Sequence, residues 1–339
     1  MTPLAAALAL SLAAPTFIPL SNAGHQPRGA SCATAAHHAF DFWLGDWIVQ
    51  NPQGQATSEN RLTTDLDGCA VLEHWSTQAG GVRGRSLNSY DASSGVWRQT
   101  WVTEQAVRGY PLRMEGGLRA DGKMDLTGVR HPWWDRNAVW LDEYIWTPVG
   151  PDEVVQEPII DVPSSNFHFH GHIRYQRTDA FPSFTPAPTS KCTPEGDSGD
   201  IRRLDAVVGS YKVSSNDGRR LGKSEIALDA TVSNCLIEES FKGEARYRAT
   251  GWIYYDPVED RFYRTLLDNR GNRVEVGGQF ADDGSLVLTG PLPGGSGLLR
   301  MTLAIAAGNL RFTWEVSSDG GATFGEEETL VYRRDAPDE

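Results

Sequence analysis

The stretch Phe40-Asp-Phe-Trp-Leu-Gly-Asp-Trp-Ile-Val49 opens a pattern that occurs twice in this chain of 339 residues. Aromatic and aliphatic side chains recur so closely in it that it is typical of a strand entering a packed sheet or barrel. Its centre, Leu44-Gly-Asp-Trp47, matches Val208-Gly-Ser-Tyr211 later in the chain. The fold is interpreted from the whole set of such matches.

Three further blocks recur in the same order and at a near-constant offset. The matched pairs are Gly68–Trp75 with Asn234–Phe241, Ser89–Trp97 with Tyr254–Phe262, and Asp121–Gly128 with Asp283–Gly290. The period is far longer than that of solenoid repeats, so each copy is expected to be a whole domain. Residues 178–200 are rich in Pro, Ser and Thr, which is typical of a linker that ties two domains covalently without merging them.

Local signals within each copy are those of strands. Short apolar or alternating runs are bounded by turn sequences such as Asp121-Gly122 and Asn216-Asp-Gly218, where Gly supplies a positive φ. A weak amphipathic helical pattern over 33–42 is a candidate for a short lid. About eight to ten strands in meander order would close into a barrel and leave no exposed edge. We therefore predict an all-β protein with two tandem antiparallel barrels, residues 40–177 and 201–334.

The N-terminal residues are typical of an export signal. Residues 4–14 form an apolar run, and Ser21-Asn-Ala23 is a small-x-small cleavage sequence. We expect a signal peptide at 1–23, a leader segment at 24–39, and a periplasmic or extracellular protein. Because no Lys or Arg precedes the apolar run, a disordered apolar tail is the alternative. The net charge of -13 argues against a nucleic-acid partner, and no later segment is apolar enough to span a membrane.

Several motifs resemble those of a bacterial protein family of unknown function. They are Phe-x-Phe-Trp-x-Gly-x-Trp at 40–47, Gly-Cys-x-x-x-Glu-x-Trp at 68–75, Tyr-Asp-x-x-x-Gly-x-Trp at 90–97 and Ser-Ser-Asp-Gly-Gly-x-x-Phe at 317–324. That family resembles the calycin-type barrels, which include lipocalins, fatty-acid-binding proteins and nitrobindins. The resemblance covers most of both halves and implies calycin-like barrels, but it names no ligand. The Gly-rich signature of nitrobindins is absent, so haem is not implied.

Four Cys in an exported chain suggest disulfides, and the duplication selects one pairing among three. Cys69 and Cys235 occupy the same repeat position, while Cys32 and Cys192 each precede a copy. We therefore predict the bonds Cys32–Cys69 and Cys192–Cys235, each tying a leader segment onto its own barrel. Four buried thiols are the alternative.

The two copies differ in the residues that are able to do chemistry. All 8 His residues and most of the 11 Trp residues precede the linker. Ser240 stands where the first copy has His74, and Thr329 stands where it has His172. We infer that the first barrel carries the functional site and that the second is a structural partner. Drift in composition would produce the same asymmetry.

Phe167-His-Phe-His-Gly-His172 is the densest group of titratable side chains. On a strand, His168, His170 and His172 share one face, and Phe167 and Phe169 share the other. Side chains at i and i+4 lie about 13 Å apart, so one strand cannot supply three ligands to one ion. Three readings stay open: a single metal ion completed by another strand, acid–base catalysis by His near neutral pH, or a solvated outer face with both Phe inward.

Further candidate residues lie outside that strand. Glu73, His74 and His131 are candidates for the additional metal ligand, and the two His are candidates for acid–base groups. Glu73 has a counterpart, Glu239, in the second copy, which favours a structural role. The candidates for ligand contact are Trp47, Glu73, Trp75, Trp101, Arg130, Trp133, Trp134 and Asp135. The loop 130–136 is expected either to form the mouth of a pocket or to pack across the barrel end or against the other domain.

Three functions are compatible with these features. We expect the first barrel to bind a small apolar or aromatic molecule, with no cofactor. An enzyme of the same architecture is the first alternative: a lyase, isomerase or hydrolase that acts on an aromatic or polyketide-like substrate through His groups, with or without one metal ion. A structural envelope protein is the second alternative. The sequence has no nucleophile elbow, phosphate loop or dinucleotide fingerprint.

Overall fold

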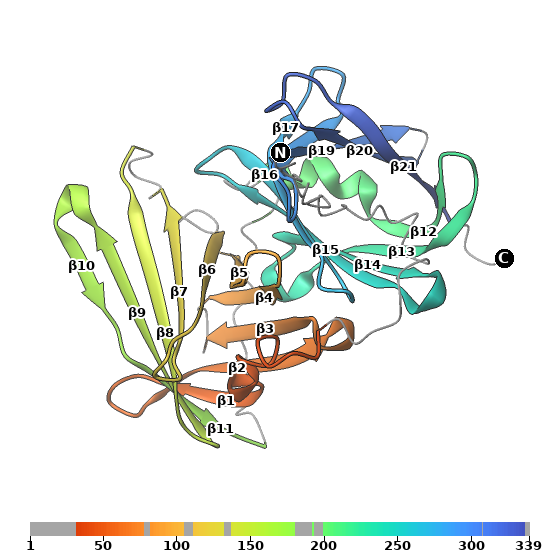
Figure 1. The fold of residues 1–339 in the computed structure, drawn as a ribbon. Coiled ribbons are helices and arrows are strands. Elements are labelled where there is room, and N and C mark those ends of the chain that lie inside the picture. Colours follow the sequence, from red (N-terminus) through yellow and green to blue (C-terminus); the bar gives the residue numbers. More distant parts are fainter. Residues whose placement is uncertain are drawn as a thin grey trace, which may run out of the picture.

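The computed structural model describes residues 32–77, 82–104, 111–131, 137–179, 192, 199–306 and 308–335. Over these residues the chain forms two closed antiparallel barrels of ten strands each, one after the other along the sequence (Figure 1). The predicted all-β fold with tandem barrels is thus confirmed. The expected signal peptide, 1–23, and most of the linker, 178–200, lie outside the described residues.

The first barrel comprises β1 to β9 and β11, and β10 extends its wall. The strands are β1 Gly45–Gln50, β2 Ala56–Asp65, β3 Ala70–Thr77, β4 Arg83–Asp91, β5 Val96–Thr103, β6 Leu112–Leu118, β7 Met124–Arg130, β8 Trp140–Gly150, β9 Glu153–Val162, β10 Phe167–His170 and β11 Ile173–Arg177. Strands β1 to β9 pair in chain order, and β11 closes the barrel by pairing with β9 and β1. The strand β10 pairs with the other end of β9, so the wall rises there beyond the closure (Figure 1).

The second barrel is an uninterrupted meander. Its strands are β12 Gly209–Ser215, β13 Arg220–Leu228, β14 Leu236–Gly243, β15 Arg248–Asp256, β16 Arg261–Asp268, β17 Arg273–Phe280, β18 Leu286–Pro291, β19 Leu298–Ala306, β20 Asn309–Ser317 and β21 Gly325–Arg334. Pairing of β12 with β21 closes it. The helices are short 3-10 turns: η2 Asp41–Trp43, η3 Leu66–Gly68, η5 Pro163–Ser165, η6 Gly199–Val207, η7 Ala230–Val232 and η8 Glu244–Arg246. No helix in the described ranges has the length and apolarity to cross a membrane.

The repeated opening motif has the same geometry in both barrels. The indole of Trp47 and the hydroxyl of Tyr211 each donate a hydrogen bond to the carbonyl oxygen four residues earlier. Gly45 and Gly209 have φ angles of 127° and 154°. A Cβ on Gly45 would lie 2.0 Å from a guanidinium nitrogen of Arg177, which stacks on Trp47 at 4.2 Å. The motif requires Gly because an arginine crosses this position.

The weak helical pattern over 33–42 does not form an α-helix, so that prediction was wrong. The segment consists of turns followed by η2. Its Phe40 and Trp43 are fully buried, and the Phe40 ring lies 5.3 Å from that of Trp146 in the barrel. Trp97 donates its indole hydrogen to a main-chain oxygen of the segment at 3.0 Å. Ring packing, rather than helix propensity, sets this structure, and the segment forms an aromatic plug at one barrel end.

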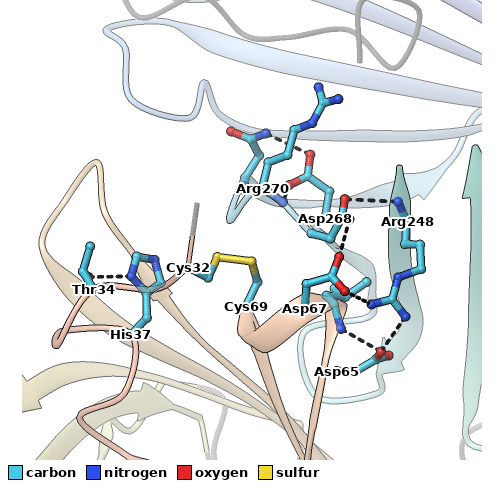
Figure 2. Close-up of a disulfide and its surroundings, with 12 residues drawn as sticks. Cys32, Thr34, His37, Asp65, Asp67, Cys69, Arg248, Asp268 and Arg270 are labelled. Atoms are coloured by element: carbon cyan, nitrogen blue, oxygen red, sulfur yellow. Dashed lines mark hydrogen bonds and ion pairs between the residues drawn. A yellow bond between two sulfur atoms is a disulfide. The ribbon is translucent and has the colours of Figure 1, made fainter. Parts of the chain in front are cut away.

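Both predicted disulfides are present, and all four Cys residues are paired. Cys32 and Cys69 are joined at 1.99 Å, and Cys192 and Cys235 at 2.02 Å. The first bond fastens the aromatic plug to the β2–β3 connection. Figure 2 shows this disulfide at the boundary with the second barrel. There Arg248 of the second barrel donates a hydrogen bond to Asp67, which lies two residues before Cys69. Each disulfide therefore ties a leader segment to its own barrel, as the duplication predicts.

The two barrels pack against each other through the outer faces of β3 to β5 and β14 to β17. Besides the two barrel cores, a third apolar cluster spans this boundary. Its buried members are Cys32, Leu66, Cys69, Ala70, Leu87, Val102, Val232, Leu236, Trp252, Tyr254 and Leu267. Arg85 of the first barrel, itself buried, donates to Asp229 and Glu238 of the second. The barrels thus share a packed interface, which the composition of the linker did not indicate.

Candidate functional site

Glu73 and Glu239 occupy the same place in the two barrels. Glu73 lies on β3 opposite Leu62, and Glu239 lies on β14 opposite Ile226. Because successive side chains of a strand alternate between faces, both point into their barrels. They are 4% and 3% exposed. The surroundings of these two carboxylates can therefore be compared group by group.

Glu239 is neutralised within its own barrel. Nη2 of Arg264, on β16, donates to Oε2 of Glu239 at 2.5 Å, and both side chains are 3% exposed. Ser224 and Tyr332 donate their hydroxyl hydrogens to Oε1 at 2.7 and 2.8 Å. The guanidinium also lies 4.6 Å from the ring centre of Phe312. This pair has its charge and its hydrogen bonds satisfied from inside the barrel.

Among the described residues, no cation pairs with Glu73. Gln99 holds the equivalent position: it lies opposite Asn88, as Arg264 lies opposite Ile253. The Gln99 amide donates to Asn88 at 2.6 Å and does not bond the acid. Burial raises the pKa of Glu73 from 4.5 to about 7. The carboxyl group therefore changes protonation near neutral pH.

The hydrogen bonds that Glu73 accepts come from neutral groups. Nδ2 of Asn60 donates to Oε1 at 2.8 Å, and the Ser86 hydroxyl donates to Oε2 at 2.6 Å. Both bonds lower the pKa of Glu73, but by less than burial raises it. Oδ1 of Asn60 is buried and has no hydrogen-bond partner in the described part of the chain. This amide oxygen is therefore an unsatisfied acceptor on the residue that bonds Glu73.

A tyrosine of the closing strand also differs between the barrels. Tyr332 bonds the carboxylate in the second barrel, whereas Tyr175 donates its hydroxyl to Gln156 at 2.9 Å. Gln156 has the register position that Phe312 has in the second barrel. Burial, and then the neighbouring acid, raise the pKa of Tyr175 well above its ordinary value. Tyr175 thus stays protonated and donates to Gln156 and not to the acid.

Large aromatic side chains on the inner wall of the first barrel stay partly exposed. Trp75, Trp101 and Tyr144 pack against the core of this barrel but are not buried. The residues at the positions of Trp75 and Tyr144 in the second barrel, Phe241 and Met301, are 3% and 0% exposed. At the positions of Trp75 and Tyr144 the first barrel therefore presents partly exposed aromatic surface, whereas the second barrel buries its side chains there; Leu266, at the position of Trp101, is partly exposed as well.

The barrel end opposite the aromatic plug carries an ion pair. Arg130 donates two hydrogen bonds to Asp142, at 2.7 and 3.0 Å, and both side chains are buried. The Arg130 guanidinium stacks on Trp140 at 4.1 Å, and the Trp140 ring contacts Phe167 at 6.4 Å. Arg130, which the sequence predicts to orient a ligand, is thus already paired with Asp142.

The His-rich strand β10 lies on the extended part of the wall, and its His side chains are exposed. Nδ1 of His168 lies 2.5 Å from Asp161, Nε2 of His170 lies 3.3 Å from Glu157, and His172 is exposed after β10. Both acids belong to the outer face of β9. Nowhere in the described ranges do three or more His, Cys, Asp or Glu come together as a metal site. Of the three readings, this geometry favours a solvated outer face.

Several other residues predicted from the sequence lie away from Glu73 and the aromatic side chains near it. Phe167 and Phe169, expected to point inward, are 48% and 44% exposed, because β10 is the last strand on its side of the sheet. His74 lies on the outer face of β3 beside the second barrel, where burial and then Arg85 lower its pKa. Nδ1 of His131 lies 2.9 Å from a main-chain oxygen of its own loop.

The predicted ligand contacts therefore divide into groups. The structure brings Glu73, Trp75 and Trp101 together, since Trp101 lies opposite the serine that bonds Glu73. Trp47 is fully buried in the opening motif. Trp133, Trp134 and Asp135 lie outside the described residues.

Two of the open grooves on the outer surface of the described residues lie along the first barrel. One of about 540 Å³ follows the outer face of β5 to β9 and is bounded by Glu275 of the second barrel. Its charged side chains are partly paired with one another, as Arg98 is with Glu115 at 2.6 Å. The other, of about 420 Å³, lies beside His74 and Arg83. Neither groove contains the inward-facing acid.

No family model matches this chain, and no curated protein matches it significantly. The functional conclusion therefore depends on the geometry of the site.

Four polar residues of the site were not singled out from the sequence. They are Asn60, Ser86, Asn88 and Gln99. The two copies, aligned beyond the matched blocks, contain the signal, because Gln99 falls opposite Arg264 and Ser86 opposite Gly251. A buried arginine in one copy that is matched by a glutamine in the other marks the place where the copies differ in chemistry.

Proposed function

We propose that this is an exported protein whose first barrel binds a small apolar or aromatic molecule, with the second barrel as a structural partner. The main support for this proposal is the difference between the interiors of the two barrels. In the first barrel, partly exposed Trp75, Trp101 and Tyr144 lie near an acid without an internal cation. Aromatic walls with a few polar anchors are typical of small-molecule sites. The two disulfides support folding in an oxidising compartment.

Binding is tested by titrating the purified protein with indole and naphthalene derivatives and following tryptophan fluorescence and thermal unfolding. The variant Trp101→Leu installs the residue that the second barrel has at this position, Leu266. We expect it to weaken binding about ten-fold, because a stacking surface is lost. Leu266→Ile in the second barrel is the matched control and should leave binding unchanged. Equal affinities for the wild type and Trp101→Leu would place the ligand elsewhere.

An enzyme is the second candidate, and one observation favours it. The pKa of Glu73, about 7, suits a group that gives or takes a proton at neutral pH. In this version Glu73, rather than the exposed His side chains, transfers a proton to or from a bound aromatic substrate. A pH–rate profile with a limb near 7 that disappears in Glu73→Gln would support it. If His170→Ala, and not Glu73→Gln, removed this limb of the profile, the acid–base group would be on β10.

A further inference from the structure

We infer that the ligand of the first barrel carries a cationic nitrogen, an ammonium or an amidinium on an aromatic body, that donates to Glu73. This nitrogen takes the place that the Arg264 guanidinium takes at Glu239. The inference rests on the proposed function and adds the chemical class of the ligand.

The second barrel provides an internal template for such a complex. Its acid, on the same strand position, accepts from Arg264 at 2.5 Å. The guanidinium lies 4.6 Å from the ring centre of Phe312 and 5.9 Å from that of Trp314. The barrel interior thus accommodates a cation between a carboxylate and aromatic faces.

In the described part of the first barrel no cation lies beside the acid, and two residues around it differ from those of the second barrel. Gln99 is shorter than Arg264 and donates to Asn88. Ser86 stands where the second barrel has Gly251, and its neutral hydroxyl bonds the carboxylate oxygen that Arg264 would bond. A Cβ on Gly251 would lie 3.2 Å from the acid and 3.5 Å from Nη2 of the arginine. These separations are close contacts and not overlaps, so a serine side chain and a cationic nitrogen can both lie beside the carboxylate.

The balance of donors and acceptors indicates which kind of ligand fits. Each oxygen of Glu73 accepts one hydrogen bond from a neutral donor, at 2.8 and 2.6 Å. Oδ1 of Asn60, a side chain with 0% exposure, has no donor within the described residues. The Tyr175 hydroxyl, the other donor close to the acid, is directed to Gln156. A ligand that brings two or three N–H groups satisfies these acceptors, and an anionic ligand would be repelled.

The aromatic side chains of the inner wall also favour a cationic ligand. Trp75 and Trp101 are partly exposed, and the Trp75 ring lies 6.1 Å from that of Tyr175. Indole faces attract organic cations, most strongly where water is excluded. The first barrel therefore offers a carboxylate, an unpaired amide oxygen and aromatic faces together.

The experiment is isothermal titration calorimetry of the full chain with four probes: 2-phenylethylamine and benzamidine as cations, 2-phenylethanol as a neutral analogue and 3-phenylpropionate as an anion. We expect the two cations to bind at least about ten-fold more tightly than the alcohol at pH 7.5. At pH 6.5, where part of the Glu73 population is protonated, binding of the amine should release protons and that of the alcohol should not.

Two variants separate this inference from the proposed function. Glu73→Gln keeps the shape of the site and should make the amine and the alcohol bind equally. Ser86→Gly combined with Gln99→Arg rebuilds the internal pair of the second barrel and should remove amine binding. His170→Ala, on the outer face, is the control and should change nothing.

The outcomes are distinguishable. Equal binding of amine and alcohol by the wild type overturns the cationic class and leaves the proposed binding function in place. Binding of the anion in preference to the amine does the same. Failure of all four probes to bind overturns both. A cation preference that survives in Glu73→Gln shows that another group selects the charge, and this also overturns the inference.

Discussion

Among the described residues, the inward-facing acid of the first barrel, Glu73, has no cation beside it, whereas the matching acid of the second barrel, Glu239, pairs with Arg264. Glu239 accepts from Arg264, and a tyrosine hydroxyl completes the pair. Glu73 accepts only from Asn60 and Ser86 among the described residues. The opening motifs of the two barrels are alike: Trp47 in the first and Tyr211 in the second each donate to a main-chain carbonyl oxygen four residues earlier. Two barrels of one design thus differ in how one buried charge is compensated.

This difference shows two ways in which one barrel scaffold holds a buried acid. A buried ion pair is satisfied by its own barrel and is costly to break. A buried acid without a cation is held in place by neutral donors, and its charge can be compensated from outside the chain. Substitutions that transfer or remove this compensation therefore test the comparison directly.

The largest effect is expected from Arg264→Met. It leaves the carboxylate of Glu239 buried without its cation, which costs about 3–5 kcal/mol of the free energy of unfolding. The matched substitution in the first barrel, Gln99→Met, breaks one neutral amide bond to Asn88 and should cost about 1 kcal/mol. Urea unfolding at pH 7.5 measures both. Similar losses for the two variants would contradict the distinction between the barrels.

The next effect concerns Glu73 and pH. Burial raises its pKa from 4.5 to about 7, so the folded protein binds a proton more tightly than the unfolded chain. The stabilisation is complete below pH 4.5 and is lost as the pH rises through 7. Between pH 4.5 and pH 8 the wild type should therefore lose about 3 kcal/mol of unfolding free energy relative to Glu73→Gln. A pH-independent difference between the two proteins would show that a group beyond the described residues neutralises the acid.

Much of the fold could be predicted because it depends on repeated local patterns. The opening motif, the Asp-Gly turns and the placement of Cys69 and Cys235 recur in both copies, so they report on the barrel and its disulfides. The aromatic plug could not be predicted. Its conformation depends on where Phe40 and Trp43 insert, which only the closed barrel determines.

The candidate site was predicted only in part. Glu73, Trp75 and Trp101 were selected as aromatic or charged residues of the first copy, and they do lie together. The spacing of the His residues of β10 predicts that they share one face of a strand. It does not reveal that this strand extends past the place where the barrel closes. The neutral donor Ser86 was missed because a serine has no chemical signature until the partner it bonds is known.

A smaller effect is expected at the boundary between the barrels. Arg85 is buried and bonds Asp229 and Glu238, so Arg85→Met should cost about 2–3 kcal/mol, because two acids lose their cation. Arg248, 40% exposed, bonds Asp67 across the same boundary (Figure 2), and Arg248→Met should cost less than about 1 kcal/mol. Urea unfolding followed by intrinsic fluorescence compares them. If Arg85→Met were as mild as Arg248→Met, the barrels would be joined by the apolar cluster alone.

The smallest effect is expected on the outer face of β10. The side chains of His168 and His170 are 62% and 53% exposed, and the carboxylates that they contact are 45% and 27% exposed. Exposed pairs of this kind contribute little, so the double variant His168→Ala with His170→Ala should change the unfolding free energy by less than about 0.5 kcal/mol. Probe affinity in the titration above should also stay within the error of the wild type, because these side chains lie outside the barrel that holds Glu73. A loss of probe binding would move the site from the interior to this face. Unchanged binding here, together with loss of amine selectivity in Glu73→Gln, would assign the difference between the two barrels to the inward-facing acid.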